Sequence, residues 1–278
     1  MDYTISMQYD FKNIAFMIHV RVDIPERLRN LELVMDYYYN QCNNVQFIII
    51  NDDKAPDERL RPLTNKYKNT SIFSFLKNDG VYRRTLSYNR AFKQTNRPIT
   101  IAGDTDIIIH PSYILKAEDK IIDGEYDHVY PYNGLFCWAK EPLVQKFKEN
   151  FDIKEFEAHK PAKKDRVPYF QNENILVAHP NSRGGCIMYS SELYKKINGY
   201  NPNFIGWGYE DDEINHRISL LGKQTGRVED DNAIAWHLPH PDTVRDKHPF
   251  YDNNNHLTTY VHSLNKEQIK EYIKTWKL

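Results

Sequence analysis

An acidic cluster opens a predicted helix in the last third of the chain, directly after a tryptophan flanked by two glycines. Ile214, Ile218 and Leu221 recur at helical spacing, which predicts an apolar face that packs inward. Asp211 precedes Ile214 by three residues, so we expect its carboxylate to lie on the same inward face. Beside the glycine-flanked Trp207, such a carboxylate suits a general base in a sugar-binding site.

The other acids of this cluster are expected to spread around the rest of the helix: Glu210, Asp212 and Glu213. Acidic residues also favour helix N-termini through the macrodipole and the free N–H groups. The cluster by itself therefore fits a purely structural role as well as a catalytic one.

Two aspartates frame Thr105 at the end of an expected buried strand. Asp104 and Asp106 can together hold a divalent cation, one directly and the other through water or a ribose hydroxyl. Hard oxygen ligands of this kind suit Mg²⁺ or Mn²⁺. The triplet alone is common by chance, and its position at the end of a central strand is what favours a function.

Two histidines three residues apart follow the last predicted strand, and Pro239 between them favours a turn. Through such a turn, His237 and His240 can share one metal ion. Together with the two aspartates they complete a mixed oxygen and nitrogen site that Mn²⁺ accepts. In a chain with 11 histidines, an ordinary surface turn is the alternative.

Charged residues also gather at the ends of other predicted elements. They are Arg21 and Asp23 after the first strand, Asp52 and Asp53 after the second, and Arg83 and Arg84 at the start of a helix. A carboxylate can accept from a uracil N–H or a ribose hydroxyl, and guanidinium groups bind phosphate oxygens. Each residue alone is an ordinary surface charge, but their shared location favours nucleotide binding.

The first half of the chain alternates predicted strands and helices. Strands are expected at 14–20, 45–50, 72–76 and 98–102, and helices at 25–35 and 86–92. This alternation is typical of a parallel sheet with right-handed crossovers, in which ligands bind at the carboxyl ends of the strands. The polar clusters at 19–23, 51–53 and 103–106 all fall at such ends.

The second half of the chain is less regular. We expect strands within 126–138 and at 186–189, 225–228 and 233–237, and helices at 142–151, 191–197 and 266–276. Ser191 is predicted to cap the second of these helices. The polar, proline-containing stretch 152–182 is predicted to be a long loop.

Composition limits the classes of protein to which this chain can belong. Its 278 residues, 40% hydrophobic and 27% charged, suit a globular α/β protein, and a net charge of −1 argues against a nucleic-acid partner. Cys42, Cys137 and Cys186 are too far apart for a disulfide framework or a zinc site and fit a reducing compartment. No apolar run approaches the roughly 18–20 residues that span a bilayer, so we expect a soluble protein. Peripheral membrane contact through a surface helix stays open.

Three short motifs occur in order between Arg183 and Ile214. They are Gly184-Gly185, Ile197-Asn198-Gly199-Tyr200 and Gly206-Trp207-Gly208-x-Glu210-Asp211-Asp212. This set resembles the GT-A glycosyltransferases, and within them the family 7-like β-1,4-galactosyltransferase group and the bacterial family 2 polysaccharide transferases. Weaker similarity covers His19-Val20-Arg21, Tyr82-Arg83-Arg84 with Asn89, Asp104 with Asp106, and His237-x-x-His240.

The resemblance implies a GT-A fold, which is a Rossmann-like α/β fold with a mixed, mostly parallel sheet flanked by helices. A single domain 1–278 is expected, with a nucleotide-binding half at 1–110 and an acceptor and catalytic half at 111–278. The galactosyltransferase-like motif spans 183–221, and the 152–182 loop would lie over the acceptor side.

Residue roles follow from the same resemblance. Asp211 would be the catalytic base. Substrate binding would involve Arg21, Asp23, Asp52, Arg84, Asp104, Gly185, Trp207, Gly208, Glu210 and Asp212, and metal binding Asp106, His237 and His240. The chain departs from the family pattern in its degraded first motif, at His237, which replaces a methionine, and at Tyr209, which replaces a glycine.

The implied activity is an inverting transfer of galactose or N-acetylgalactosamine from a UDP-sugar to a hydroxyl of a glycan or lipid-linked glycan, with Mn²⁺ or Mg²⁺ as cofactor. The match points to a bacterial cytoplasmic enzyme of polysaccharide or surface-glycan synthesis, with association at the inner face of the membrane left open. Two alternatives remain: a retaining transferase on the same scaffold, and a non-catalytic module that binds nucleotide-sugar or carbohydrate.

Overall fold

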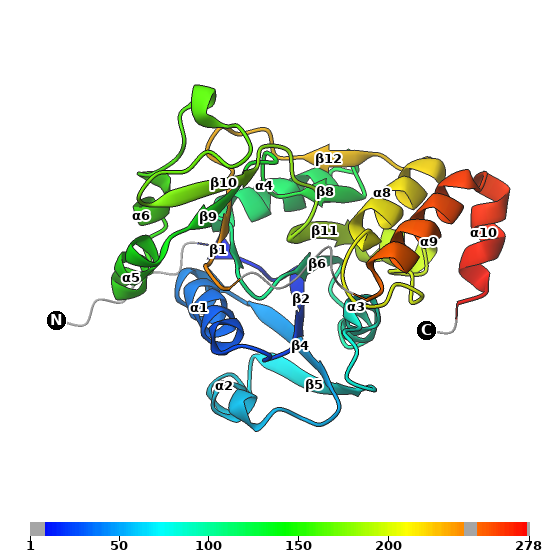
Figure 1. Cartoon of the computed structure of the whole chain (residues 1–278), viewed down its shortest axis with the longest axis horizontal. Coiled ribbons are helices and arrows are strands. Elements are labelled where there is room, and N and C mark those ends of the chain that lie inside the picture. The colour runs from blue at the N-terminus through cyan, green and yellow to red at the C-terminus, as the bar shows by residue number, and fades with distance from the viewer. Residues whose placement is uncertain (1–8, 242–248, 277–278) are drawn as a thin grey trace.

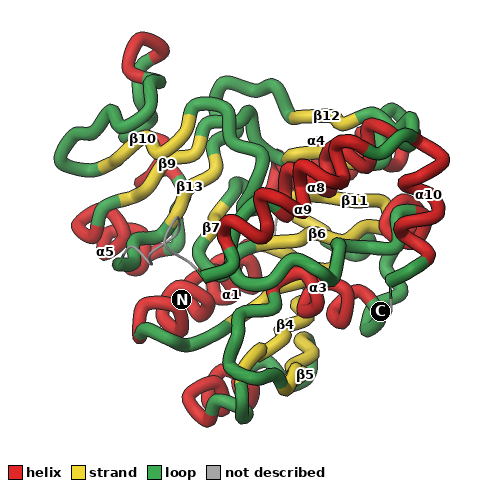
Figure 2. Tube along the Cα trace, turned by 45° about the vertical axis from the view of Figure 1, so that its right-hand side comes forward, coloured by secondary structure: helices red, strands yellow, loops and turns green. Residues whose placement is uncertain are grey.

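The computed structural model describes residues 9–241 and 249–276, and its largest sheet has seven strands flanked by helices (Figures 1 and 2). In spatial order the strands are β12 (Thr225–Arg227), β8 (His128–Tyr130), β11 (Cys186–Ser190), β6 (Ile99–Gly103), β2 (Ile14–Val20), β4 (Gln46–Asp53) and β5 (Ser71–Lys77). Strands β6, β2, β4 and β5 run parallel, whereas β11 is antiparallel to both β6 and β8. The predicted α/β fold with a mixed, mostly parallel sheet is confirmed.

The central strands form because their apolar runs can be covered on both faces of the sheet. Strand β2 is buried along its whole length, and β4 is buried at all but its two end residues. The prediction that residues 51–53 follow the second strand was wrong, since β4 continues through Asp53. Asp52 pairs with Leu76 of β5 and Asp53 with Lys77, so the backbone stays in the sheet.

Ten α-helices occur in the described part of the chain. They are α1 (Pro25–Gln41), α2 (Arg61–Lys66), α3 (Arg84–Phe92), α4 (Pro111–Ile122), α5 (Glu141–Asn150), α6 (Lys154–Glu157), α7 (Ser191–Lys196), α8 (Glu210–Leu220), α9 (Tyr251–Ser263) and α10 (Lys266–Lys274). Pro25 opens α1 as expected, because its missing N–H is not needed there. The predicted cap of α7 was wrong by one residue. The Ser190 side chain accepts from the Leu193 N–H at 3.1 Å, while the Ser191 hydroxyl donates to the Arg97 carbonyl.

A second sheet lies beside the first and has four short strands. They are, in order, β10 (Ile175–His179), β9 (Phe136–Ala139), β13 (Ala235–His237) and β7 (Ile107–Ile108), and β1 (Tyr9–Asp10) pairs separately with β3 (Cys42–Asn43). The prediction of one long loop over 152–182 was wrong in part, because this stretch contains α6 and β10. Ile175 and Val177 alternate with less buried residues, which is the pattern of an edge strand.

Helix α9 was not predicted, and it packs alongside α8 (Figures 1 and 2). Its buried residues are Asn254, Thr258 and Val261, so two of the three are polar and its apolar periodicity is weak. Helices α9 and α10 share a small hydrophobic cluster that includes Val261 and Trp276.

A buried ion pair on α8 holds this helix against the segment 197–199. Arg217 is fully buried and pairs with Glu213 at 2.8 Å. Its guanidinium also donates to the carbonyls of Ile197 and Gly199 and lies 4.6 Å from the Trp276 ring centroid. Each of the three guanidinium nitrogens of this buried cation therefore has a partner, as burial of a charge requires.

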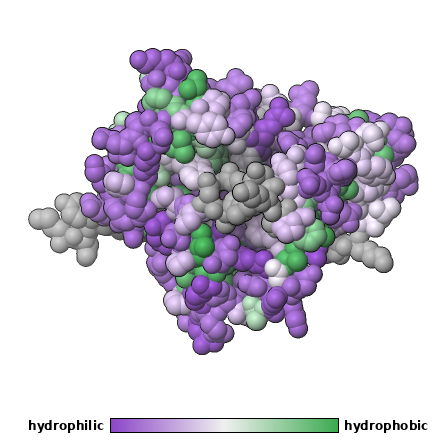
Figure 3. All heavy atoms as spheres, in the orientation of Figure 1, coloured by the Kyte–Doolittle hydropathy of each residue, from purple (hydrophilic) through white to green (hydrophobic). Residues whose placement is uncertain are grey.

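The surface is mostly polar. On the face shown in Figure 3, hydrophilic residues predominate and hydrophobic residues form small separate patches. No helix within residues 9–241 and 249–276 is both long enough and apolar enough to cross a membrane. The three cysteines are buried and free.

Candidate active site

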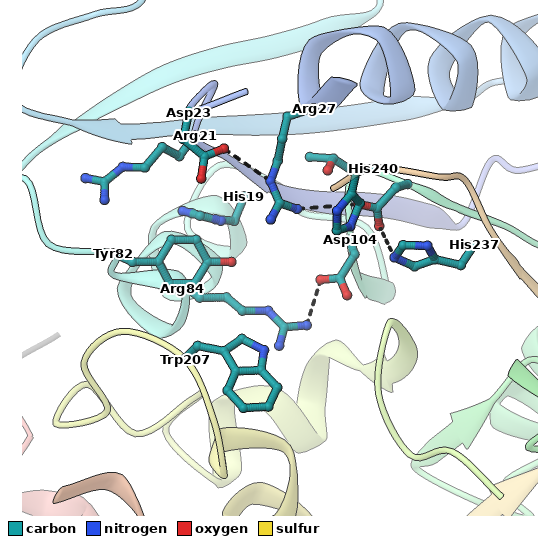
Figure 4. Close-up of a pocket in the computed structure, with 12 residues that line it drawn as sticks. His19, Arg21, Asp23, Arg27, Tyr82, Arg84, Asp104, Trp207, His237 and His240 are labelled. Carbon is teal, nitrogen blue, oxygen red and sulfur yellow. Dashed lines mark hydrogen bonds and ion pairs between the residues drawn. The ribbon is translucent and has the colours of Figure 1, made fainter. Parts of the chain in front are cut away.

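A polar pocket of about 100 Å³ lies at the carboxyl ends of β2 and β6, and we call it the strand-end pocket (Figure 4). Its lining consists of His19, Arg21, Asp23, Arg27, Tyr82, Arg84, Asp104, Thr105, Asp106, Trp207, His237 and His240. Eight predicted site residues therefore meet in one place: Arg21, Asp23, Arg84, Asp104, Asp106, Trp207, His237 and His240. The topology explains this meeting, because parallel strands place the residues that follow them at one edge of the sheet.

One carboxylate and two imidazoles converge at one end of this pocket. Asp106 Oδ1 lies 3.5 Å from His237 Nε2, and Asp106 Oδ2 lies 3.4 Å from His240 Nε2. Asp106 directly precedes β7, whose antiparallel pairing with β13 sets Ile107 opposite His237. The Trp138 ring stacks on His237 with centroids 4.5 Å apart and planes at 12°, which fixes the imidazole orientation.

This triad fits a divalent metal ion. One ligand atom from each of its three residues lies within 4.8 Å of the others, and a mixed set of carboxylate oxygen and imidazole nitrogen suits Mn²⁺. Burial raises the pKa of Asp106, although the positive charge of Arg27 and a protonated His240 oppose this effect. A bound cation would favour the carboxylate in the same way. Asp104 lies outside the triad.

Arg84 links the strand-end pocket to a neighbouring cavity. Its guanidinium contacts three carboxylates, Asp104 at 2.7 Å, Glu210 at 2.5 Å and Asp211 at 3.6 Å. It was predicted to bind nucleotide, but in the structure its charge is already shared by these acids, and the nucleotide role stays a prediction. Since Arg84 is itself buried, it holds the start of α8 against the end of β6.

The neighbouring cavity has a volume of about 590 Å³, and we call it the α8 cavity. Its lining consists of Arg84, His179, Asn181, Ser182, Arg183, Gly184, Trp207, Gly208, Tyr209, Glu210, Asp211, Asp212 and Tyr251. His179 ends β10, so the 152–182 stretch does reach this side of the molecule.

The predicted arrangement of the acidic cluster was wrong in part, because Glu210 and Glu213 were expected around the rest of the helix and are the most buried acids of the cluster. Glu210 and Glu213 are the buried acids, whereas the Asp211 side chain is 24% exposed and Asp212 is exposed. The reason is local: Tyr209 takes a left-handed conformation with φ 70°, and Glu210 folds back to accept from the Gly208 N–H at 3.0 Å. The helix therefore begins with Glu210 facing inward.

Asp211 nevertheless lines the α8 cavity. Its Oδ1 is buried and has no hydrogen-bond partner among the described residues. Burial raises the pKa of Asp211 to about 7, Arg84 opposes this shift, and Glu210 adds to it. A Cβ on Gly184 would lie 2.7 Å from Asp211 Oδ2, so only glycine leaves room for the carboxylate there.

Trp207 lies between the two cavities and lines both. Its ring stacks on Tyr251 with planes at 8° and remains 36% exposed. The flanking Gly206 and Gly208 have φ of 76° and 109°, conformations that glycine adopts without strain. This segment could therefore change conformation when a ligand binds.

Two predicted substrate-binding residues lie behind the pocket instead of lining it. Asp52 is fully buried, where it accepts from the Arg83 N–H at 2.6 Å and contacts His19 Nε2 at 3.1 Å. Gly185 accepts from the Asp104 N–H at 2.9 Å through its carbonyl. Both position other residues of the pocket.

Sequence reasoning also missed residues that the structure adds to the site. Arg27 contacts Asp106 at 3.4 Å and Asp23 at 3.3 Å, and its i,i+4 spacing from Asp23 was a readable signal. Trp138 meets His237 because β9 pairs with β13, which no local pattern predicts.

Solved structures share this arrangement of elements. The chain aligns over 94% of its length with GalNAc-T7 in complex with UDP, GalNAc and Mn²⁺ (TM-score 0.60, 11% identity, 53% of that chain). It aligns equally far with Staphylococcus aureus TarS in complex with UDP-GlcNAc (TM-score 0.57, 11% identity, 70% of that chain). The chain has the GT-A fold. A mutant of Drosophila β1,4-galactosyltransferase 7 with manganese, UDP-Gal and xylobiose also matches (TM-score 0.51, 14% identity, 93% of this chain and 83% of that one).

Sequence comparison places this GT-A chain near the galactosyltransferases. Residues 171–241 match the family model described as the N-terminal domain of galactosyltransferase. Rat β-1,4-galactosyltransferase 6 is 23% identical over 183 residues, which are 65% of this chain and 38% of the rat enzyme. Human β-1,4-galactosyltransferase 5 is 34% identical over 65 residues, which are 23% of this chain and 17% of the human enzyme. The resemblance to the β-1,4-galactosyltransferase group is confirmed, although the matched region spans well under half of these relatives.

Proposed function

We propose that this protein is a metal-dependent, inverting glycosyltransferase that moves galactose or N-acetylgalactosamine from a UDP-sugar to a hydroxyl of a glycan. The observation that carries this proposal is the meeting of two cavities. A metal-binding triad lies in the strand-end pocket, a raised-pKa carboxylate lies in the α8 cavity, and Arg84 and Trp207 line both.

The strand-end pocket has the groups that a UDP-sugar donor needs. Asp106, His237 and His240 would hold Mn²⁺ or Mg²⁺, which when bound neutralises diphosphate charge and stabilises the leaving UDP. Arg21 and Arg27 line the same pocket and can donate to phosphate oxygens.

The wall made by His19 and Tyr82 suits the uncharged part of the nucleotide. Their rings meet edge to face with centroids 4.4 Å apart. Burial lowers the pKa of His19, so its imidazole is neutral at physiological pH despite the adjacent Asp52. An uncharged aromatic wall of this kind can pack against a base or a ribose.

Asp211 would act as the general base. As the acceptor oxygen bonds to the anomeric carbon, the bond from that carbon to the phosphate oxygen breaks and UDP leaves with the electron pair. Asp211 takes the hydroxyl proton, and its pKa near 7 matches the range in which a base works best. Attack from the face opposite to UDP inverts the anomeric configuration. Trp207 would cover the donor and exclude water.

The retaining alternative is less favoured, because Asp211 lines the cavity that would hold the acceptor, where its carboxylate can accept the hydroxyl proton. A non-catalytic module needs neither the buried triad nor a carboxylate with a raised pKa at this place. We also propose cytoplasmic action on a surface glycan or lipid-linked glycan, which the three buried free thiols support.

The test is UDP release by the purified protein against a panel of UDP-sugars, with and without Mn²⁺ or Mg²⁺. We expect metal-dependent release with one preferred donor, and loss of that release in Asp106→Asn. The product anomer then distinguishes inversion from retention. Failure to bind UDP in the presence of metal would overturn the nucleotide-sugar assignment.

A further inference from the structure

A second polar cavity of about 550 Å³ opens beside the α8 cavity, and we call it the flank cavity. The two cavities share Asn181, Arg183 and Asp212 in their linings. The flank cavity is bounded by β8, β12, α8 and α9, which lie together in Figure 1. The two cavities therefore adjoin at these three residues.

The flank cavity carries two arginines that lack an acidic partner. Among the described residues, neither Arg183 nor Arg227 has a carboxylate within ion-pair distance, and Asp212 is the one acid in the lining. Arg183 is exposed, whereas Arg227 is partly buried and stacks on the Tyr130 ring at 4.7 Å. Most other arginines of the described chain, including the buried Arg217, are ion-paired.

Holding Arg227 in this position has an energetic cost. Burial lowers the pKa of Arg227, and the like charge of Arg183 adds to this effect. Carbonyls accept from part of the Arg227 guanidinium, Ser182 at 2.8 Å and Tyr132 at 3.3 Å, and the charge of Glu229 opposes the lowering of the pKa, but no described carboxylate forms an ion pair with Arg227. Two cations without an ion-paired acid at one cavity wall form a site for an anion.

Neutral groups in the same cavity suit a sugar. Asn215 and Ser219 line it on α8, and the Tyr130 ring forms part of the wall. His216 Nε2 is buried and has no hydrogen-bond partner among the described residues. Amides, hydroxyls and an imidazole are the usual partners of sugar hydroxyls and anionic oxygens.

We propose that the flank cavity binds the unit of the acceptor next to the reacting sugar, and that this unit carries a carboxylate or a phosphate. The anion would lie against Arg183 and Arg227, while the acceptor hydroxyl reaches Asp211 in the adjoining α8 cavity. This inference rests on the proposed function and extends it to the chemical class of the acceptor.

The experiment measures acceptor binding directly, by calorimetry on the whole protein with UDP and Mn²⁺ present. The probes are cellobiose, the corresponding cellobiouronic acid, and a ribitol phosphate dimer. We expect at least one anionic probe to bind about tenfold more tightly than cellobiose at low salt, because a charge-assisted hydrogen bond contributes roughly that factor. Added salt should weaken the anionic probe more than cellobiose.

Arg183→Gln is the informative variant, since Arg183 is exposed and its loss should leave the melting temperature unchanged. It should weaken the anionic probe about tenfold and cellobiose less than about twofold. Arg90→Gln, at an exposed arginine on α3, is the matched control and should change neither.

Each outcome decides the proposal. Preference for the uronic acid identifies a carboxylate acceptor, and preference for the ribitol phosphate identifies a phosphate acceptor. Equal binding of neutral and anionic probes, or no binding of either anion up to about 10 mM, overturns it. UDP release without acceptor is measured in parallel, so failure of this inference is distinguishable from failure of the proposed function.

Discussion

The strand-end pocket and the α8 cavity adjoin each other but differ in the contacts of their charged groups and in their volumes. In the strand-end pocket Asp106 contacts three groups of opposite or potentially opposite charge, His237, His240 and Arg27, although Arg21 Nη2 has no hydrogen-bond partner among the described residues. In the α8 cavity Asp211 keeps a buried oxygen without a partner among the described residues. The volumes differ as well, about 100 Å³ against about 590 Å³.

This difference follows from the elements that form each cavity. Paired strands fix the backbone on which the strand-end residues lie, so their geometry is set before any ligand binds. The α8 cavity is formed largely by a helix start and by glycine-containing segments that lie outside the strands. We infer that donor recognition is pre-organised to a greater extent than acceptor recognition.

The largest expected effect is a loss of turnover, which involves the α8 cavity, with little change in UDP affinity, which involves the strand-end pocket. Asp211→Asn keeps the shape of the side chain but removes the base, so turnover should fall about 10²- to 10⁴-fold. UDP affinity, measured by calorimetry with Mn²⁺, should change little because Asp211 does not line the strand-end pocket. Near-normal turnover would disprove the assignment of the base.

A second variant moves the base without removing it. Gly184→Ala places a Cβ 2.7 Å from Asp211 Oδ2, and the carboxylate end must shift away. A displacement on this scale should lower kcat about 10²-fold, while thermal unfolding and UDP affinity stay close to those of the parent protein. If kcat is unchanged, the position of Asp211 against Gly184 does not matter for turnover.

The metal triad is tested from the donor side. His240→Asn should raise the Mn²⁺ concentration needed for half-maximal UDP release by at least about tenfold, since even indirect partners of a metal contribute that much. A chelator should abolish release in the parent protein. His256→Asn, at an exposed histidine on α9, is the control. An equal shift in both variants would argue against a metal at Asp106.

The smallest expected effect is a gradual change of kcat/KM with pH. Asp211 must be ionised to accept a proton, and its pKa in the ligand-free protein is raised to about 7. The value of kcat/KM should therefore be level above that pH and fall about tenfold for each pH unit well below it. A profile that stays level down to about pH 5, near the usual aspartate range, would contradict a base in this environment.

The parts of the fold that could be predicted are those with a local physical signal. The apolar run of β2 ends where expected, and Pro25 marks the start of α1. Helix α9 had no such signal, because Asn254 and Thr258 fill buried positions that a pattern search reserves for apolar residues. Strand β10, at the edge of the second sheet, was missed for a similar reason, because polar residues precede and follow it in the sequence.

In the candidate site, too, the residues that could be predicted were those with a signal in the sequence or in the topology. Residues after parallel strands, such as Arg21 and Asp106, were predictable because topology alone brings strand ends together. The contact between Trp138 and His237 depends on strand pairing across about a hundred residues of chain, which spacing cannot reveal. The orientation of Glu210 was missed because it depends on the left-handed Tyr209, and a helical wheel does not include that residue.

The buried pair of Glu213 and Arg217 has a consequence for how this protein can diversify. It secures α8 through contacts that face away from both ligand cavities. Ser219, which is exposed on the same helix and lines the flank cavity, takes no part in this ion pair. A substitution at Ser219 can therefore alter the lining of the flank cavity while the contacts that hold α8 in place stay intact.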